Sequence, residues 1–160
     1  RSRFASAVLR MSQGTDGSVF VGLTNRGWSS LGTASYGLQR LVWTGEVPFE
    51  IKEMRAKPDG FELLFTKPVN REVALATSSY EMSSHTYLYH STYGSDEIQK
   101  QTLAINKATV SEDGLRVRLQ VDGLRELFIH ELVAPMIRSR DGEPLLHLHA
   151  WYTLNRIPEE

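Results

Sequence analysis

The sequence predicts an all-β fold built as a β-sandwich. Short segments rich in β-branched and aromatic residues recur along the chain, and several alternate apolar with polar residues. The dipeptide Asp-Gly occurs five times. Both of its residues tolerate the positive φ that tight reversals between strands require. No segment sustains an apolar period of 3.6 residues, so we expect little helix.

Eight segments carry the strand pattern. They are SVFVGL (18–23), LQRLVW (38–43), FEIKEMRA (49–56), FELLFTK (61–67), HTYLYHS (85–91), LRVRLQV (115–121), FIHELVA (128–134) and LHAWYTL (148–154). In 115–121, leucine and valine alternate with arginine and glutamine, which predicts one face on a core and one in water. The segment 70–80 can hold one helical turn, with Asn70 as its N-cap.

The distribution of strands divides the chain near residue 46. Residues 1–45 are rich in glycine and serine and hold two obvious strands, whereas strands recur regularly through 46–158. The second region has the size of an immunoglobulin-like domain. We therefore expect a compact sandwich at 46–158, preceded by an extension at 1–45 that packs on it and lengthens it.

Composition excludes several classes of function. The chain has 18 basic and 19 acidic residues and a formal net charge of -1, so no basic face for nucleic acid or an anionic membrane is expected. No apolar run approaches the roughly 18 residues of a membrane-spanning helix. There are no cysteines, which removes disulfides, thiolate nucleophiles and Cys-ligated metals. Motifs for nucleotide binding (G-x-G-x-x-G) and serine hydrolysis (G-x-S-x-G) are absent from the sequence.

His147 and His149 are the candidate metal ligands. On a strand, residues two apart share a face, so an H-x-H pair can bind one metal ion when a neighbouring strand supplies a further ligand. The candidates for that ligand are His130, Glu131, His85 and His90. The alternative is that both imidazoles face solvent while Leu148, Ala150, Tyr152 and Leu154 form the core face of the last strand.

The stretch SSHTYLYHSTYGSDE (83–97) is the candidate ligand-binding surface. His85, Tyr87 and Tyr89 would share one strand face, with Tyr93 following. Tyrosine combines a flat apolar ring with a hydroxyl, which suits a sugar ring or a protein partner. The exposed-loop Trp28 and the last-strand Trp151 could extend this surface. The alternative is that the tyrosines cover the edge of the core with their hydroxyls in water.

Residues 47–155 carry a spaced set of turn and strand-end residues. The set is Phe65, Thr66, Pro68, Val69, Asn70, Tyr80, Asp113, Gly114, Leu124, Asp141, Gly142, Pro144 and Leu145. It resembles the pattern of bacterial Ig-like domains of surface and exported proteins. The resemblance implies an immunoglobulin-like β-sandwich that has no catalytic residues. Residues 84–107 depart from the plain module as an insertion.

A second set lies in the N-terminal region: Gly14, Asp16, Gly17, Ser18, Val19, Phe20, Val21, Gly22, Gly37, Leu38, Arg40, Leu41, Trp43 and Gly45. It resembles the last blade of β-propellers related to glucose/sorbosone dehydrogenases. The resemblance implies that 1–45 is part of a propeller blade and that the parent is an exported PQQ-type sugar dehydrogenase. That family's catalytic base, quinone contacts and calcium ligands lie in earlier blades, so none is carried onto this chain.

Together these features predict a non-catalytic accessory or interaction module of an exported sugar-dehydrogenase-like protein. Its expected partners are the other domains of the parent, its expected location is extracytoplasmic, and no cofactor, nucleic acid or membrane insertion is expected. A carbohydrate-binding module that uses the aromatic and histidine surface is the alternative. A metal-binding domain built on His147, His149 and His130 is a third possibility.

Overall fold

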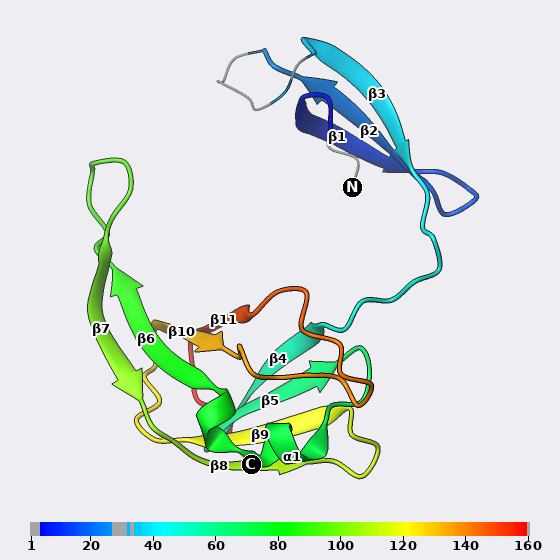
Figure 1. Cartoon of the computed structure of the whole chain (residues 1–160). Coiled ribbons are helices and arrows are strands. Elements are labelled where there is room, and N and C mark those ends of the chain that lie inside the picture. The colour runs from blue at the N-terminus through cyan, green and yellow to red at the C-terminus, as the bar shows by residue number, and fades with distance from the viewer. Residues whose placement is uncertain (1–3, 27–31, 33, 160) are drawn as a thin grey trace. The chain divides into compact units, whose positions relative to one another are not determined.

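The computed structural model describes residues 4–26, 32 and 34–159. The chain forms two compact units, the first ending at Glu46 and the second beginning at Val47. All three sheets are antiparallel, which confirms the all-β prediction (Figure 1). Among the residues described, no helix is long and apolar enough to cross a bilayer.

The first unit is a three-stranded meander. Its strands are β1 (Ala7–Gln13), β2 (Val19–Thr24) and β3 (Tyr36–Leu41), in the order β1-β2-β3. The sequence predicted β2 and β3 but missed β1, whose seven residues are all exposed and show no clear alternation. Gly17, at φ 80°, closes the turn between β1 and β2, as the Asp-Gly signal predicts.

Both faces of this sheet carry exposed apolar side chains. Val21 and Leu23 of β2 are buried, yet Met11, paired with Val21 on the same face, is 68% exposed. On the opposite face, Tyr36 and Leu38 of β3 are also largely exposed. The three strands therefore leave apolar surface uncovered on each side.

The second unit contains two four-stranded sheets (Figure 1). Sheet I has the order β4-β5-β9-β8, with strands Ile51–Lys57, Gly60–Phe65, Arg116–Val121 and Ile105–Val110. Sheet II has the order β11-β10-β6-β7, with strands His149–Leu154, Phe128–Val133, Glu81–Tyr87 and Glu97–Leu103.

The two sheets share one apolar core. Phe61 and Leu63 of β5 and Leu119 of β9 are fully buried and belong to the same cluster as Met82 of β6 and Leu132 of β10. On β9 the buried residues alternate with exposed or half-buried ones, as the sequence pattern predicted. The arrangement is that of two sheets packed face to face, as in a β-sandwich.

A short helical segment carries the chain from sheet I to sheet II. It consists of α1 (Arg71–Leu75) and a 3-10 turn, η1 (Thr77–Ser79). The Asn70 side chain accepts a hydrogen bond from the Val73 N–H at 3.2 Å, which confirms the predicted N-cap. Tyr80, directly after η1, donates its hydroxyl to the Ala74 carbonyl at 2.9 Å, and burial raises the pKa of this hydroxyl.

Three strands of the second unit were missed or displaced in the prediction. β7 and β8 were missed: β7 is an edge strand with mostly exposed residues, so its sequence EIQKQTL shows no core face. β6 was predicted at 85–91 but spans Glu81–Tyr87. Tyr89 and His90, which suggested the later position, lie in the connection after β6, whereas pairing with β10 sets the true register.

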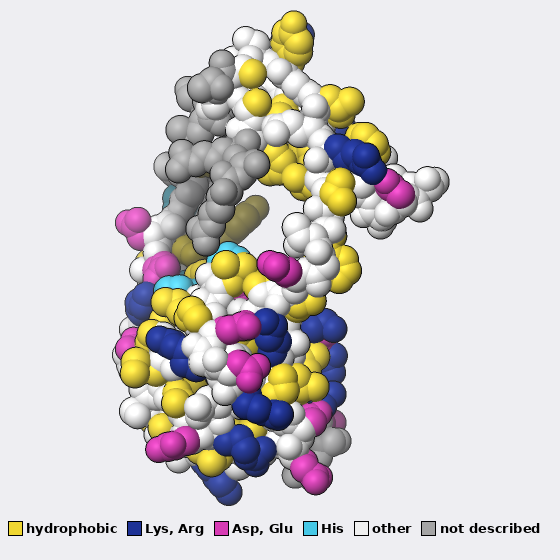
Figure 2. Space-filling view, turned by 45° about the vertical axis from the view of Figure 1, so that its right-hand side comes forward, with side chains coloured by type: hydrophobic (Ala, Val, Ile, Leu, Met, Phe, Trp, Pro, Cys, Tyr) yellow, Lys and Arg dark blue, Asp and Glu magenta, His cyan; other side chains and the backbone are white. Residues whose placement is uncertain are grey.

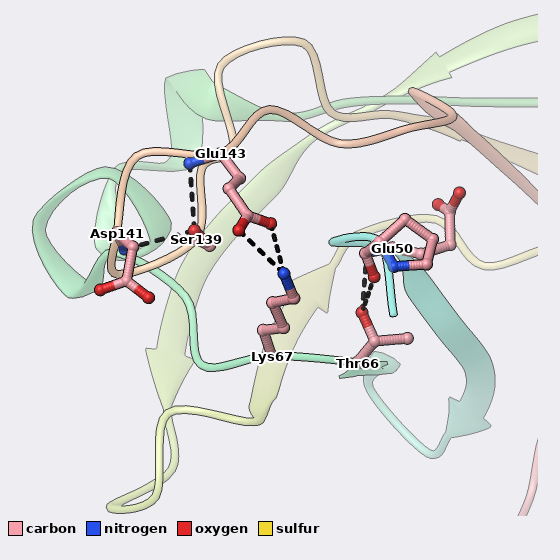
Figure 3. Close-up of polar contacts among 7 residues, drawn as sticks. Glu50, Thr66, Lys67, Ser139, Asp141 and Glu143 are labelled. Carbon is pink, nitrogen blue, oxygen red and sulfur yellow. Dashed lines mark hydrogen bonds and ion pairs between the residues drawn. The ribbon is translucent and has the colours of Figure 1, made fainter. Parts of the chain in front are cut away.

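Polar contacts hold the long connection between β10 and β11 (Figure 3). The Lys67 Nζ lies 2.8 and 2.6 Å from the two carboxylate oxygens of Glu143. The Ser139 hydroxyl accepts hydrogen bonds from the N–H groups of Asp141 and Glu143, at 3.2 and 3.0 Å. These contacts tie the segment before β11 to Lys67, two residues after the end of β5.

Candidate functional site

The outer face of sheet II carries four of the candidate residues, namely His85, Tyr87, His149 and Trp151. Glu131 of β10 lies opposite Trp151 of β11 and Ser83 of β6 in the register. Residues directly opposite one another in antiparallel strands share a face. The neighbouring positions His130 and Leu132 are fully buried and point to the core, so Glu131 and its partners form the outer face.

Five side chains form a connected row on this face, which we call the polar ladder. His149 Nδ1 lies 2.9 Å from Glu131 Oε1, and Glu131 Oε2 lies 3.8 Å from Lys100 Nζ. The same Nζ lies 2.9 Å from Glu97 Oε2. Glu97 Oε1 lies 3.8 Å from His85 Nε2. The ladder thus joins residues from all four strands of sheet II.

The central ion pair of the ladder is mutually stabilised. The hydrogen bond from Lys100 lowers the pKa of the Glu97 carboxyl, and the nearby His85 adds to this effect. The same hydrogen bond from Lys100 to Glu97 raises the pKa of the lysine, with a smaller contribution from Glu131. Both shifts favour the ionised forms, so Lys100 is held as an ammonium between carboxylates.

An aromatic ring lies at each end of the ladder. The Trp151 indole stacks on His149 with ring centroids 5.4 Å apart and an interplanar angle of 13°. Trp151 is 60% exposed, so the other side of the ring is open to solvent. Tyr87 contacts His85 edge to face at 5.4 Å. His85 is only 2% exposed, and its Nδ1 has no hydrogen-bond partner among the residues described.

Two hollows flank the ladder. One, of about 600 Å³, is lined by polar side chains from four elements together with apolar neighbours: Thr77 and Ser78 of η1, Glu81 and Ser83 of β6, Lys100 and Thr102 of β7, and Glu131 of β10. The other, of about 680 Å³, is lined by Glu50, His147, His149 and Trp151 with neighbouring aliphatic residues. Glu131 faces the first hollow and His149 the second, so the ladder connects them.

The structure places the predicted ligand-binding residues in different regions of the chain. His85, Tyr87 and Trp151 lie on the outer face of sheet II together. Tyr89 and Tyr93 lie in the connection between β6 and β7, where both are fully exposed and outside the sheet. Trp28 lies outside the described residues.

The three predicted metal ligands are not brought together as a set, although His147 and His149 line the same hollow. His147 Nδ1 contacts Glu50 Oε2 at 2.6 Å, and His149 contacts Glu131 on the outer face. His130 points the other way: its ring is fully buried against Phe61, with centroids 5.3 Å apart. In the part of the chain that the structure describes, no group of three His, Asp or Glu residues is placed to hold a metal ion.

The hydrogen bonds and burial of the His130 imidazole indicate a structural role in the core. Its Nε2 accepts a hydrogen bond from the Arg125 N–H at 3.3 Å, and its Nδ1 lies 3.3 Å from the Phe128 carbonyl, to which it donates. Burial lowers the pKa of this imidazole, and the nearby Arg125 and His85 lower it further. The neutral form is therefore the one that the fold accommodates.

Sequence reasoning included Glu97 in the stretch 83–97 but missed Lys100 and its pairing with Glu97, because of a local irregularity in β7. Residues three apart on a regular strand point to opposite faces. Here Gln99 adopts a positive φ of 54°, and the register of β6 and β7 shifts between Ser84 and Thr86. This bulge turns Lys100 toward Glu97 and Glu131. The sequence contained no signal for the irregularity.

Comparisons with known proteins give a fold but no family. No protein-family model and no curated protein matches the chain. Similar folds occur in solved structures of the bacterial S-layer protein SbsC. Its N-terminal part matches with a TM-score of 0.52, and domains 1-6 and the fragment rSbsC(31-844) each with 0.51. Each match covers 68% of this chain at 18% identity, and this chain spans only 14 to 24% of those proteins.

Proposed function

We propose that residues 47–160 form a non-catalytic structural and interaction module of a larger exported protein. The observation that carries the proposal is the pair of four-stranded sheets around a single core, a fold shared with parts of a surface-layer protein. Such a module has its own core and can space or dock neighbouring domains. Its partners are then other domains of the parent, and its location is extracytoplasmic.

We further propose that this module is Ig-like. In immunoglobulin constant-type domains one sheet has the strand order A-B-E-D and the other contains C, F and G. Numbered from β4 with β7 left out, sheet I has the first, second, fifth and fourth strands in sequence, and sheet II the seventh, sixth and third followed by β7 as an inserted strand. The order supports the proposal, with β7 as the added strand within the predicted insertion 84–107.

The structural role can be tested in the parent protein. Deletion of residues 47–160 should impair display or assembly of the parent outside the cytoplasm, measured by fractionation and protease accessibility. Activity per correctly folded molecule of any catalytic domain should be unchanged. A parent that is exported and assembled normally without these residues would refute the structural role, and loss of activity in a folded, exported deletion protein would refute the non-catalytic one.

The link to a sugar dehydrogenase is proposed from the sequence pattern at 14–45. In a propeller, neighbouring blades would cover the apolar side chains that both faces of this three-stranded sheet expose. The parent is then expected to oxidise aldoses with a dye acceptor when supplied with PQQ. A folded parent that shows no PQQ-dependent turnover on a panel of aldoses would refute this link and leave the structural role intact.

A further inference from the structure

We propose that the outer face of sheet II is a binding site for neutral oligosaccharides, running from Trp151 across the polar ladder into the hollow beside Lys100. This site goes beyond the structural role of the module and does not depend on it. The proposal rests on three features of the face: an open aromatic platform, a set of convergent hydrogen-bonding groups, and a balance of charge.

The aromatic platform is Trp151. One side of its ring stacks on His149, which is itself held by Glu131, and the residue remains 60% exposed. The ring is therefore fixed in orientation before a ligand arrives, which reduces the entropy lost on binding. A flat apolar ring next to polar groups suits the C–H face of a sugar, whose hydroxyls then reach the polar neighbours.

The hydrogen-bonding groups converge on the first hollow. Hydroxyls from Thr77, Ser83 and Thr102 line it together with Lys100 and Glu131. Hydroxyls both donate and accept, carboxylates accept and the ammonium donates. Sugar hydroxyls also donate and accept, so neighbouring hydroxyls of one ring can be satisfied by such a mixed set. From Trp151 on β11 to Lys100 and Thr102 on β7 the sheet spans three gaps of about 4.8 Å between strands, roughly 14 Å, which is long enough for a short oligosaccharide.

The charge of the face argues for a neutral ligand. The one lysine that lines the first hollow is paired with Glu97 and lies 3.8 Å from Glu131, so it presents no free positive charge for an anion. Glu81 adds a further carboxylate to the same hollow. An anionic polysaccharide would therefore meet net negative charge, whereas a neutral one would meet groups already held in place by their ion pairs.

The proposal can be tested by calorimetric titration of the full chain with defined probes. Neutral probes are the pentasaccharides of β-1,4-glucose, α-1,4-glucose and β-1,4-N-acetylglucosamine, and the anionic probe is a pentagalacturonate. We expect at least one neutral probe to bind with a Kd below about 1 mM. The anionic probe should bind at least about tenfold more weakly.

Two variants and one control locate the site. Trp151→Ala should weaken binding of the neutral probe at least about tenfold through loss of the stacking platform. Thr102→Val, which keeps the side-chain volume at an exposed edge-strand position, should weaken it about three- to tenfold by removing one hydroxyl. Trp43→Ala is the matched control, because Trp43 is 72% exposed and lies in the first unit. It should leave the Kd unchanged.

Folding of each variant is checked by circular dichroism and thermal unfolding before titration, and Thr102→Val keeps the test informative if Trp151→Ala does not fold. The site is refuted if no neutral probe binds below about 10 mM. It is also refuted if Trp151→Ala, or in its absence Thr102→Val, binds as tightly as the Trp43→Ala control. Preference for the anionic probe would overturn the assigned ligand class.

Discussion

His130 is a buried histidine whose surroundings oppose a positive charge. Burial is the main cause of its lowered pKa, with Arg125 and His85 acting in the same direction. At pH values between the lowered folded-state pKa and the ordinary pKa of about 6.5, His130 binds more protons in the unfolded chain than in the folded one. The contribution of His130 to stability is therefore complete above about pH 6.5 and is lost as the pH falls through the folded-state pKa.

We predict that the free energy of unfolding decreases as the pH is lowered from about 7 to 5, with at most about 1.4 kcal/mol per pH unit from this residue. Urea unfolding at several pH values measures the slope. His130→Gln should reduce the pH dependence of the free energy of unfolding, even if it lowers that free energy at every pH. His90→Gln is the control, because His90 is exposed in the β6–β7 connection. An unchanged slope in His130→Gln would contradict the assignment.

At the scale of elements, the contact between β5 and β9 depends on a glycine. Gly60 begins β5 and pairs with Gln120 of β9. It has φ 149°, and a Cβ at this position would lie 2.0 Å from the Leu119 carbonyl oxygen. Since that oxygen belongs to the backbone of a central strand, relief of the clash must displace the strand itself. The close approach of the two strands therefore requires glycine.

We predict that Gly60→Ala lowers the free energy of unfolding by about 4 kcal/mol or more, because it combines an unfavourable φ with a backbone clash. Gly142→Ala is the matched control: Gly142 also has a positive φ of 87°, but nothing lies within 4 Å of its added Cβ. The control should cost only about 1–2 kcal/mol, the strain of the backbone conformation. Equal losses in the two variants, measured by urea unfolding, would contradict the role of the β5–β9 contact.

The strand prediction was accurate where an element buries one face. β9 and β11 show the expected alternation, with Tyr152 and Leu154 toward the core and Trp151 outward. Prediction failed for β1, β7 and β8, in which half or more of the residues are exposed, because an exposed strand needs no apolar period. For the candidate site, Trp151, His149 and His85 were identified, but Lys100 and its pairing with Glu97 were not, since a bulge in β7 determines where Lys100 points.

At the scale of the whole molecule, the two units differ in how completely each covers its own apolar surface. The second unit encloses a continuous core between its sheets. The first is a single three-stranded sheet with Leu9, Met11, Tyr36 and Leu38 largely exposed. The second unit therefore buries enough apolar surface to fold alone, whereas the first does not. Figure 2 shows basic and acidic side chains interspersed over the face of the second unit that it draws.

We predict that a chain of residues 47–160 unfolds in one cooperative transition, with a midpoint within a few degrees of the main transition of the full chain. A chain of residues 1–46 should either lack a cooperative unfolding transition or associate with other copies, because its apolar side chains are not buried within the unit. Differential scanning calorimetry and analytical ultracentrifugation measure both. A loss of cooperativity in 47–160 would show that the second unit depends on the first.

The sequence by itself determined the all-β class, the Asp-Gly turns and the Asn70 cap, because these depend on the period of a strand and on side chains a few residues apart. Tertiary structure decided which residue each histidine contacts. His149 contacts Glu131, 18 residues away, and His147 contacts Glu50, 97 residues away, while His130 turns to the core. Sheet order and register set such neighbours, and neither can be derived from local alternation.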